Sequence, residues 1–180
     1  TTSEIYFFTV SEENPKPKLF KKRQKEIIYS LDSWKGNFYI HTNQDAEDFK
    51  ICTCKHENIN EWKEYIPATN GVLIGGFTLL NDWMVRSEVR NALSKLYVRN
   101  LSTNKEEELT ITDEKVITPG SSLMQKNRNT NKLYVAYHSP KTPGKSYIYD
   151  IVTKEKKLVK EEEVPSGHNP NDYLVERLSC

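Results

Sequence analysis

Three short stretches of the chain carry residue types that do chemistry in other proteins. Cys52, Cys54 and His56 alternate along one segment, so in a strand their side chains would share one face and could bind a metal ion. Structural zinc sites use pairs two to four residues apart together with a second pair, and no second pair is present. We therefore expect two strand cysteines and a turn histidine, with no metal and no other cofactor.

The second stretch, Pro143-Gly144-Lys145-Ser146, imitates the end of a phosphate-binding loop. That motif requires another glycine five residues before Gly144, where this chain has Ser139. The residues that follow predict a strand rather than a helix, so no helix N-terminus would hold a phosphate. We expect residues 140–145 to form a hairpin turn.

The third stretch pairs His138 with Ser139, and either Asp150 or Asp172 could orient the histidine as in a catalytic triad. A hydrolase serine usually lies in a Gly-x-Ser-x-Gly turn between a strand and a helix, and that pentapeptide does not occur here. A turn before Pro140 is the simpler interpretation. The sequence therefore predicts no catalytic residue in these 180 positions.

Charge and composition exclude some partners. The chain has 26 basic and 25 acidic residues and a net charge of +1, which gives no bias toward nucleic acid or anionic lipid. The one basic run, Lys16 to Lys25, fits a solvated strand edge better than a nucleic-acid site. Asn100-Leu101-Ser102 matches a glycosylation sequon, and we interpret it as a turn.

The same properties suggest a compartment. No apolar stretch approaches the length needed to cross a bilayer, and no signal peptide is visible. Three cysteines, two of them on one short segment, do not resemble a disulfide framework. We expect a cytoplasmic protein without a membrane partner, and, because the sequence enters a strand pattern at once without an initiator methionine, a piece of a longer chain.

The elements that position these residues repeat along the chain. Strand patterns open at Phe38, Trp83 and Leu133, which lie 45 and 50 positions apart. Each has an apolar segment before it, a second strand after it and then a more charged strand. The apolar segments that come first cover 27–30, 73–77 and 121–124. The second strands cover 49–53, 95–99 and 146–150, and the charged strands cover 61–65, 106–111 and 155–159. Four short strands per repeat of this length are typical of β-propeller blades.

We therefore predict an all-β fold, a partial β-propeller of about three and a half four-stranded antiparallel blades. The expected parts are a half blade over 1–23, blades over about 24–67, 68–112 and 113–162, and an exit strand over 172–178. Blades stack face to face, so uncovered blade faces would favour self-association.

The residues also carry a family resemblance. The segments concerned are Phe38 to Asn43, Asn60 to Pro67, Gly76 to Val85, Ala136 to Pro143 and Asp172 to Leu178. In order and spacing they resemble blades of the oligopeptidase B (protease II) group of the prolyl oligopeptidase family of serine peptidases. The resemblance spans nearly the whole chain. His138, Pro140 and the terminal Ser179-Cys180 depart from the group's pattern.

The resemblance implies a function that spacing alone does not. In that family a seven-bladed propeller caps an α/β-hydrolase domain that carries the Ser-Asp-His triad, and members of the group cleave short peptides after Arg or Lys. The propeller would act as a steric filter. The hydrolase domain and the catalytic residues would lie outside these 180 residues, so the partners would be that domain and peptide substrates.

By the same resemblance, Glu176 and Arg177 would form the hinge between the propeller and the hydrolase domain; the simpler interpretation is an exposed local ion contact. The alternative function is a propeller fragment of a protein-interaction scaffold without enzymatic activity. In either case we expect these 180 residues alone to be inactive.

Overall fold

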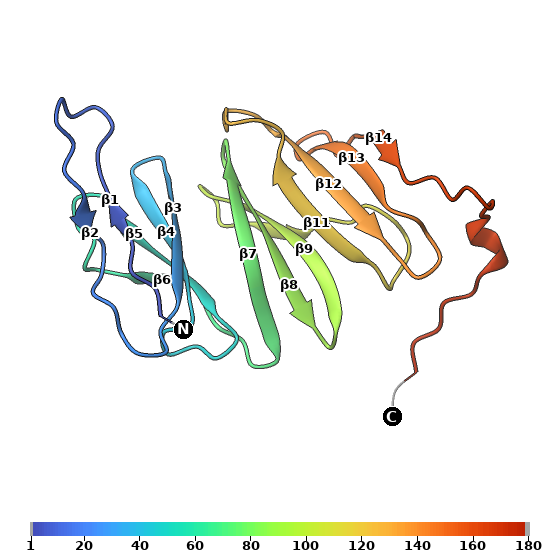
Figure 1. The fold of residues 1–180 in the computed structure, drawn as a ribbon, viewed down its shortest axis with the longest axis horizontal. Coiled ribbons are helices and arrows are strands. Elements are labelled where there is room, and N and C mark those ends of the chain that lie inside the picture. Colours follow the sequence, from blue (N-terminus) through green and yellow to red (C-terminus); the bar gives the residue numbers. More distant parts are fainter. Residues whose placement is uncertain (1, 179–180) are drawn as a thin grey trace. The chain divides into compact units, whose positions relative to one another are not determined.

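The structure, a computed structural model, describes residues 2–178. These residues form three four-stranded antiparallel sheets, one two-stranded piece and one short 3-10 helix, η1 (Pro170–Asp172) (Figure 1). This arrangement confirms the predicted all-β class and the count of three four-stranded sheets preceded by half a sheet. The chain divides into two compact units, unit 1 up to Ile74 and unit 2 from Gly75, and each is described by itself.

Unit 1 contains the two-stranded piece and one four-stranded sheet. Its strands are β1 (Tyr6–Phe7), β2 (Lys18–Leu19), β3 (Tyr29–Trp34), β4 (Asn37–Thr42), β5 (Lys50–Lys55) and β6 (Lys63–Ile66). β3 to β6 pair in chain order. The turn between β3 and β4 has Lys35 and Gly36 at φ 48° and 78°, and two such left-handed residues make the tightest hairpin turn.

The core of unit 1 is aromatic. The ring of Phe20 lies 5.1 Å edge-to-face from Phe38 and 5.8 Å from the ring of Trp62, on which it stacks. Phe7, on β1, lies 5.1 Å from Phe38. Aromatic pairs of this geometry contribute about 0.5–1.5 kcal/mol beyond the area that they bury, so the short two-stranded piece is held on the sheet mainly by its rings.

Unit 2 is built from two four-stranded sheets. The first comprises β7 (Val72–Leu80), which begins in unit 1, β8 (Trp83–Arg90), β9 (Leu93–Asn100) and β10 (Glu106–Glu108). The second comprises β11 (Thr118–Leu123), β12 (Lys132–His138), β13 (Lys145–Asp150) and β14 (Lys156–Glu161). Between β8 and β9, Asn91 and Ala92 both have left-handed φ values, 50° and 56°, so this turn is as tight as that of unit 1.

The two sheets of unit 2 share one aliphatic core. Val85 and Val98 face it from the first sheet, and Leu133 and Val135 from the second; all four are at most 2% exposed. Because strand side chains alternate between faces, every second side chain of each sheet points toward this core. The opposite faces therefore determine what else the two sheets contact.

The observed sheets, 29–66, 72–108 and 118–161, fall within the ranges expected from the repeat. The exit strand expected over 172–178 is wrong. Residues 170–172 form η1, capped by Asn169, and no strand follows within the described residues. A strand needs a neighbouring strand to satisfy its backbone groups, and this segment pairs with none in the part of the chain that the structure describes.

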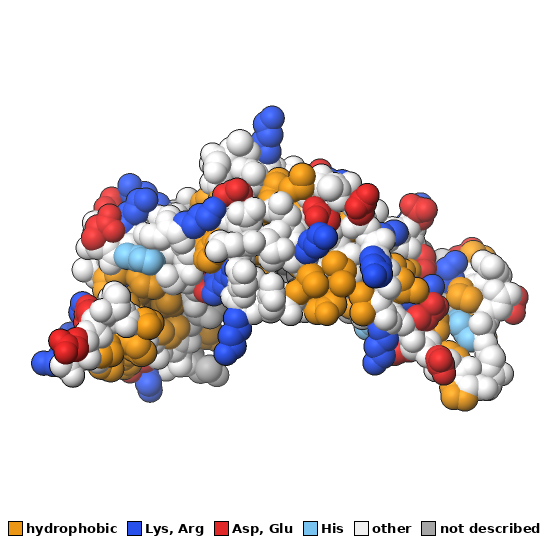
Figure 2. Space-filling model, turned by 90° about the horizontal axis from the view of Figure 1, so that it is seen from above, with side chains coloured by type: hydrophobic (Ala, Val, Ile, Leu, Met, Phe, Trp, Pro, Cys, Tyr) orange, Lys and Arg blue, Asp and Glu red, His pale blue; other side chains and the backbone are white. Residues whose placement is uncertain are grey.

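Charged side chains of both signs are interspersed on the face of the molecule that Figure 2 shows, with apolar side chains gathered between them. Five basic residues of the run, Lys16, Lys18, Lys22, Arg23 and Lys25, are exposed, while Lys21 is half-buried. Two of the exposed ones are paired, since Lys18 lies 3.7 Å from Glu12 and Arg23 lies 3.2 Å from Glu4. Among residues 2–178, no helix is long and apolar enough to span a bilayer.

Candidate functional site

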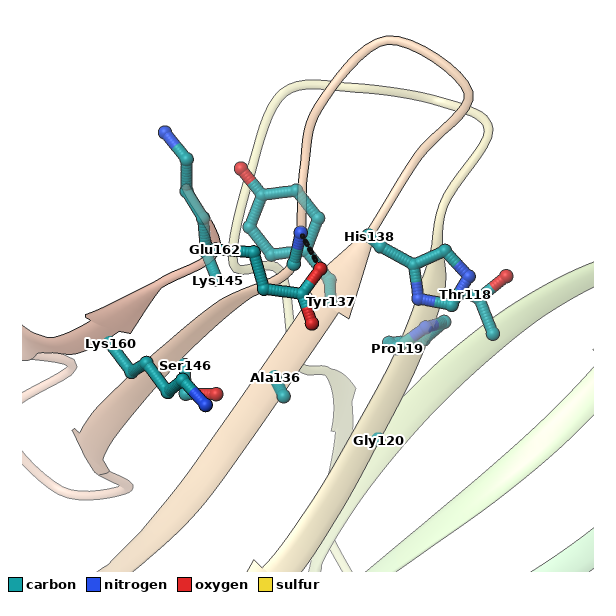
Figure 3. A pocket seen from close by; sticks show the side chains of 11 residues that line it. Thr118, Pro119, Gly120, Ala136, Tyr137, His138, Lys145, Ser146, Lys160 and Glu162 are labelled. Carbon is teal, nitrogen blue, oxygen red and sulfur yellow. Dashed lines mark hydrogen bonds between the residues drawn. The ribbon is translucent and has the colours of Figure 1, made fainter. Parts of the chain in front are cut away.

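The structure does not bring the His138–Ser139 group together as a triad. The Ser139 hydroxyl donates to a carboxylate oxygen of Glu114 at 2.5 Å, not to the histidine. His138 is exposed at the end of β12, beside Thr118 in Figure 3. Asp150 pairs with Lys132 at the other end of the same sheet, so it lies far along the strands from His138. Asp172 lies in η1 and accepts from Asn169.

The cysteine group is part of the unit 1 core. Cys52 and Cys54 lie buried on β5, and burial raises the pKa of both thiols, that of Cys54 to about 11. His56 follows the strand, with Nε2 3.0 Å from the Ser33 hydroxyl and its ring 4.4 Å from that of Phe38. Within residues 2–178, no three His, Cys, Asp or Glu side chains are grouped so that they could hold a metal ion.

The phosphate-loop look-alike is a hairpin loop that leads into β13. The Gly144 backbone N–H donates to Glu162 (Figure 3). Lys145 lies 3.0 Å from Glu161, and its hydrogen bond to that carboxylate raises the lysine pKa. A strand follows the loop, as predicted. The Asn100 carboxamide accepts from the N–H groups of Ser102 and Thr103, which is a turn role.

A more promising site is the end of unit 2 where several loops meet, which we call the loop edge. It consists of the β8–β9 turn (91–92), the β10–β11 connection (109–117), the β12–β13 loop (139–144) and the C-terminal segment 164–178. Because the strands run antiparallel in chain order, the first three lie at corresponding ends of their sheets. Loops on a rigid sheet scaffold are where binding residues concentrate.

Glu114 ties two of these loops together. Its carboxylate accepts hydrogen bonds from the hydroxyls of Ser139, at 2.5 Å, and of Thr142, at 2.6 Å. The Ser139 hydroxyl in turn accepts from the backbone N–H groups of Lys141 and Thr142. Thr142 is only 4% exposed. Hydrogen bonds to a charged acceptor are the strong ones, so the 139–144 loop has a defined shape.

The C-terminal segment runs along these loops. His168 Nε2 lies 2.6 Å from the carbonyl oxygen of Lys141, and its ring stacks on that of Tyr173 with 5.1 Å between centroids. Leu174 is 84% exposed and borders a crevice of about 350 Å³ that the 112–116 residues and Lys141 also line. Apolar surface in a crevice of this kind suits binding of a protein segment.

Of the two residues assigned to a hinge, Arg177 has a partner. Its guanidinium donates to the backbone carbonyl of Asn91 in the β8–β9 turn. Glu176 is exposed, as is Arg177. Terminal residues Ser179 and Cys180, noted as departures from the family pattern, lie outside the described residues.

Sequence reasoning missed Glu114, His168 and Asn91 as members of this edge. Ser139 and Thr142 are spaced three residues apart, a spacing that favours a loop closed by hydroxyl hydrogen bonds, which signals the loop but not its partner. Nothing local marks the partners of Asn91, Glu114 or His168, because these partners are 25 to 86 residues away in the chain.

Residues 1–162 match the family model of the N-terminal β-propeller domain of prolyl oligopeptidase. The chain belongs to the prolyl oligopeptidase family. Its sheets are therefore propeller blades, as predicted. The other members of this family that are compared below are peptidases.

Similar proteins include peptidases of bacteria. Dipeptidyl aminopeptidase BI of Pseudoxanthomonas mexicana is 28% identical over 159 residues, which cover 87% of this chain and 21% of that protein. Protease 2 of Moraxella lacunata is 21% identical over 178 residues, 99% of this chain and 25% of that protein.

Solved structures show the fold of this propeller part. Oligopeptidase B from Trypanosoma brucei, in a closed form with covalently bound antipain, matches with a TM-score of 0.85 at 24% identity, over 96% of this chain and 26% of that one. Oligopeptidase B from Leishmania major matches with a TM-score of 0.85 at 17% identity, over 98% and 26%. The chain thus spans about a quarter of the length of these relatives.

Proposed function

We propose that this chain is the propeller part of a serine oligopeptidase that cleaves short peptides after Arg or Lys, and that the propeller is a steric filter over the active site. The observation that carries the proposal is the series of strand motifs, from Phe38 to Leu178, that resembles the oligopeptidase B group in order and spacing. The likeness to Protease 2 supports it. The loop edge, where the segment 164–178 lies on the blades, supports a junction with a further domain.

The complete gene product tests the specificity. Peptides with a blocked N-terminus and Arg, Lys, Pro or Ala before a chromogenic group would be compared by kcat/KM. We expect Arg and Lys substrates to exceed the others by on the order of 100-fold, because a pocket that pairs with a basic side chain is left with unpaired polar groups when a neutral side chain occupies it. A serine-directed reagent should abolish turnover, whereas a preference for Pro would contradict the proposal.

A second candidate follows from the 28% identical dipeptidyl aminopeptidase. An enzyme of that type would release dipeptides only from a free N-terminus. The same Arg peptides with free and blocked amino groups separate the two candidates, since an endopeptidase of the first kind cleaves the blocked form. The 180-residue chain should cleave neither form. If the full gene product also cleaves neither form, a protein-interaction scaffold without enzymatic activity would be favoured.

The proposed filter role of the propeller and the proposed hinge at Arg177 can each be tested separately. Short Arg peptides should be cleaved at rates at least about 100-fold above those for the same sequence in a folded protein. Arg177→Ala should change kcat for the complete protein with little change for Glu163→Ala, an exposed control. We further propose a cytoplasmic location, supported by the two free buried thiols, which cell fractionation would test.

A further inference from the structure

The turn that leads into β7 contains an asparagine followed by a glycine. Asn70-Gly71 is the one such pair in the 180-residue sequence, and both residues are exposed. The backbone N–H of Val72 donates to the carbonyl oxygen of Thr69 at 3.0 Å, which closes a β-turn around the pair. Gly71 has a φ of 71°. The third position of this turn therefore favours glycine, the residue that adopts the left-handed region at no steric cost.

An asparagine before a glycine is chemically labile, because the next backbone nitrogen can attack the side-chain amide and glycine has no Cβ to obstruct it. In this reaction the Gly71 nitrogen bonds to Cγ of Asn70 and the bond from Cγ to Nδ2 breaks. Ammonia leaves with the proton that the backbone N–H gives up. Water then opens the ring at either carbonyl, which leaves aspartate or isoaspartate at position 70.

Asp48 restrains the nitrogen that would attack. The Gly71 N–H donates to Oδ2 of Asp48 at 3.2 Å. A hydrogen bond to a charged acceptor is stronger than one between neutral groups, and this one holds the proton that the reaction removes. A neighbouring negative charge also disfavours the deprotonated nitrogen. The turn must therefore open and release Asp48 before the Gly71 nitrogen reaches the Asn70 side chain.

We propose that Asn70 is a site of spontaneous deamidation by this route, and that the contact between Asp48 and Gly71 limits its rate. The reaction consumes only water, which has access to the exposed turn. It is independent of the peptidase activity, because none of these residues takes part in that activity.

The modification would loosen the start of β7. Asp48 binds this segment twice, because its backbone carbonyl also accepts from the N–H of Ile74 at 3.0 Å. His41 Nε2 lies 2.8 Å from the carbonyl oxygen of Ile74. Aspartate at position 70 adds a negative charge near Asp48, and isoaspartate lengthens the backbone of the turn by one methylene group. Either product weakens the contact between Asp48 and Gly71.

The rate of deamidation tests the proposal. The complete gene product is incubated at neutral pH, and peptide mass spectrometry measures the mass gained when the side-chain NH2 becomes OH. Asp48→Ala should accelerate the reaction at Asn70 by about 10-fold, because loss of the hydrogen bond populates the open turn. Glu47→Ala removes an exposed carboxylate from the same loop and should leave the rate unchanged. Equal rates in the Asp48→Ala and wild-type proteins would overturn the proposal.

Asn60 serves as an internal reference for unfolding of unit 1. It is exposed but precedes Glu61, whose side chain obstructs the attack, so its rate should be the same in every variant. If Asp48→Ala accelerates Asn60 as well, the variant has unfolded, and Asp48→Asn takes its place. That side chain keeps its size and an acceptor but loses the charge, so we expect a gain of about 3-fold at Asn70. No gain there would overturn the proposal.

Hydrogen exchange tests the structural consequence. Asn70→Asp imitates one product, and Asn70→Ser is a neutral control. Exchange of the Ile74 amide should be about 3-fold to 10-fold faster in Asn70→Asp than in Asn70→Ser, because repulsion from Asp48 favours local opening. Equal exchange would show that the modification leaves the start of β7 unchanged, against the proposed loosening.

Discussion

The two sheets of unit 2 share one core but differ in the faces that they turn away from it. On β7–β10, Arg86 and Glu88 are buried, and the guanidinium binds the carboxylates of both Glu88 and Glu106. Arg99 lies 3.5 Å from Glu106 and balances the charge. On β11–β14, the corresponding face carries a glycine, an alanine and a serine beneath a hollow.

Two blades of one repeat can therefore present outer faces of different chemistry. The ion network satisfies its charges with side chains of its own sheet, and Arg86 also lies over the ring of Tyr97 at 5.1 Å. On that face Arg86 binds carboxylates from two strands of its own sheet. The face of β11–β14 that points away from the shared core carries instead the small residues Gly120, Ala136 and Ser146 beneath a hollow of about 360 Å³. Substitutions on each sheet test this contrast.

The largest effect is expected from Arg86→Ala. Removing the guanidinium leaves Glu88, whose side chain is 8% exposed, buried without its partner, and breaking a buried pair typically costs about 3–5 kcal/mol. Denaturant unfolding measures the loss. Lys95→Ala, which removes a half-exposed partner of Glu108 on the same sheet, is the control and should cost less than about 1 kcal/mol. If both variants lost the same free energy of unfolding, burial of the ion network would contribute nothing to stability.

Leu133→Ala tests the shared core. The side chain is fully buried between the sheets, and its truncation should lower the free energy of unfolding by about 3 kcal/mol through lost transfer energy and a residual cavity. Val152→Ala, at an exposed apolar position, should change it by less than about 0.5 kcal/mol. A small loss at Leu133 would argue that the two sheets are not packed as described.

Glu114→Ala extends the contrast to the loop edge. It removes the acceptor of two hydroxyl hydrogen bonds, one of them from the buried Thr142, and should destabilise by about 1–3 kcal/mol. Hydrogen exchange should show the larger change in residues 139–144. Glu163→Ala, at an exposed position just before the C-terminal segment, serves as the control, and equal exchange in both variants would contradict the role of Glu114.

The smallest effect expected is on acid stability. Burial alone would raise the pKa of Glu106, but the hydrogen bond and charge of Arg86, with Arg99, lower it overall from 4.5. The unfolded chain then binds the proton more tightly than the folded protein, so the contribution of Glu106 is present above pH 4.5 and is lost as the pH falls below that value. Glu106→Gln should flatten unfolding free energy against pH between about 5 and 3; an unchanged slope would contradict the shift.

Much of the fold was predictable because its signals are local. The openings at Phe38, Trp83 and Leu133 predicted three β-sheets, and all three formed. The exit strand failed because strand-like alternation over 172–178 says nothing about whether a partner strand is available. Of the site, Arg177 was named in advance, whereas its contact with the Asn91 carbonyl, 86 residues away, was not.

The all-β class, the spacing of the blades and the hairpin turns follow from local sequence, because alternation and left-handed turn residues act over two to ten positions. Which charged side chains pair and which small residues align across strands depends on the folded sheets. Arg86 pairs with Glu106, 20 residues away in the chain. Gly120, Ala136 and Ser146 lie in one row across three strands. Strand register sets both; the hydrophobic pattern and the turn geometry fix that register, but it brings residues of different strands together only when the whole sheet forms.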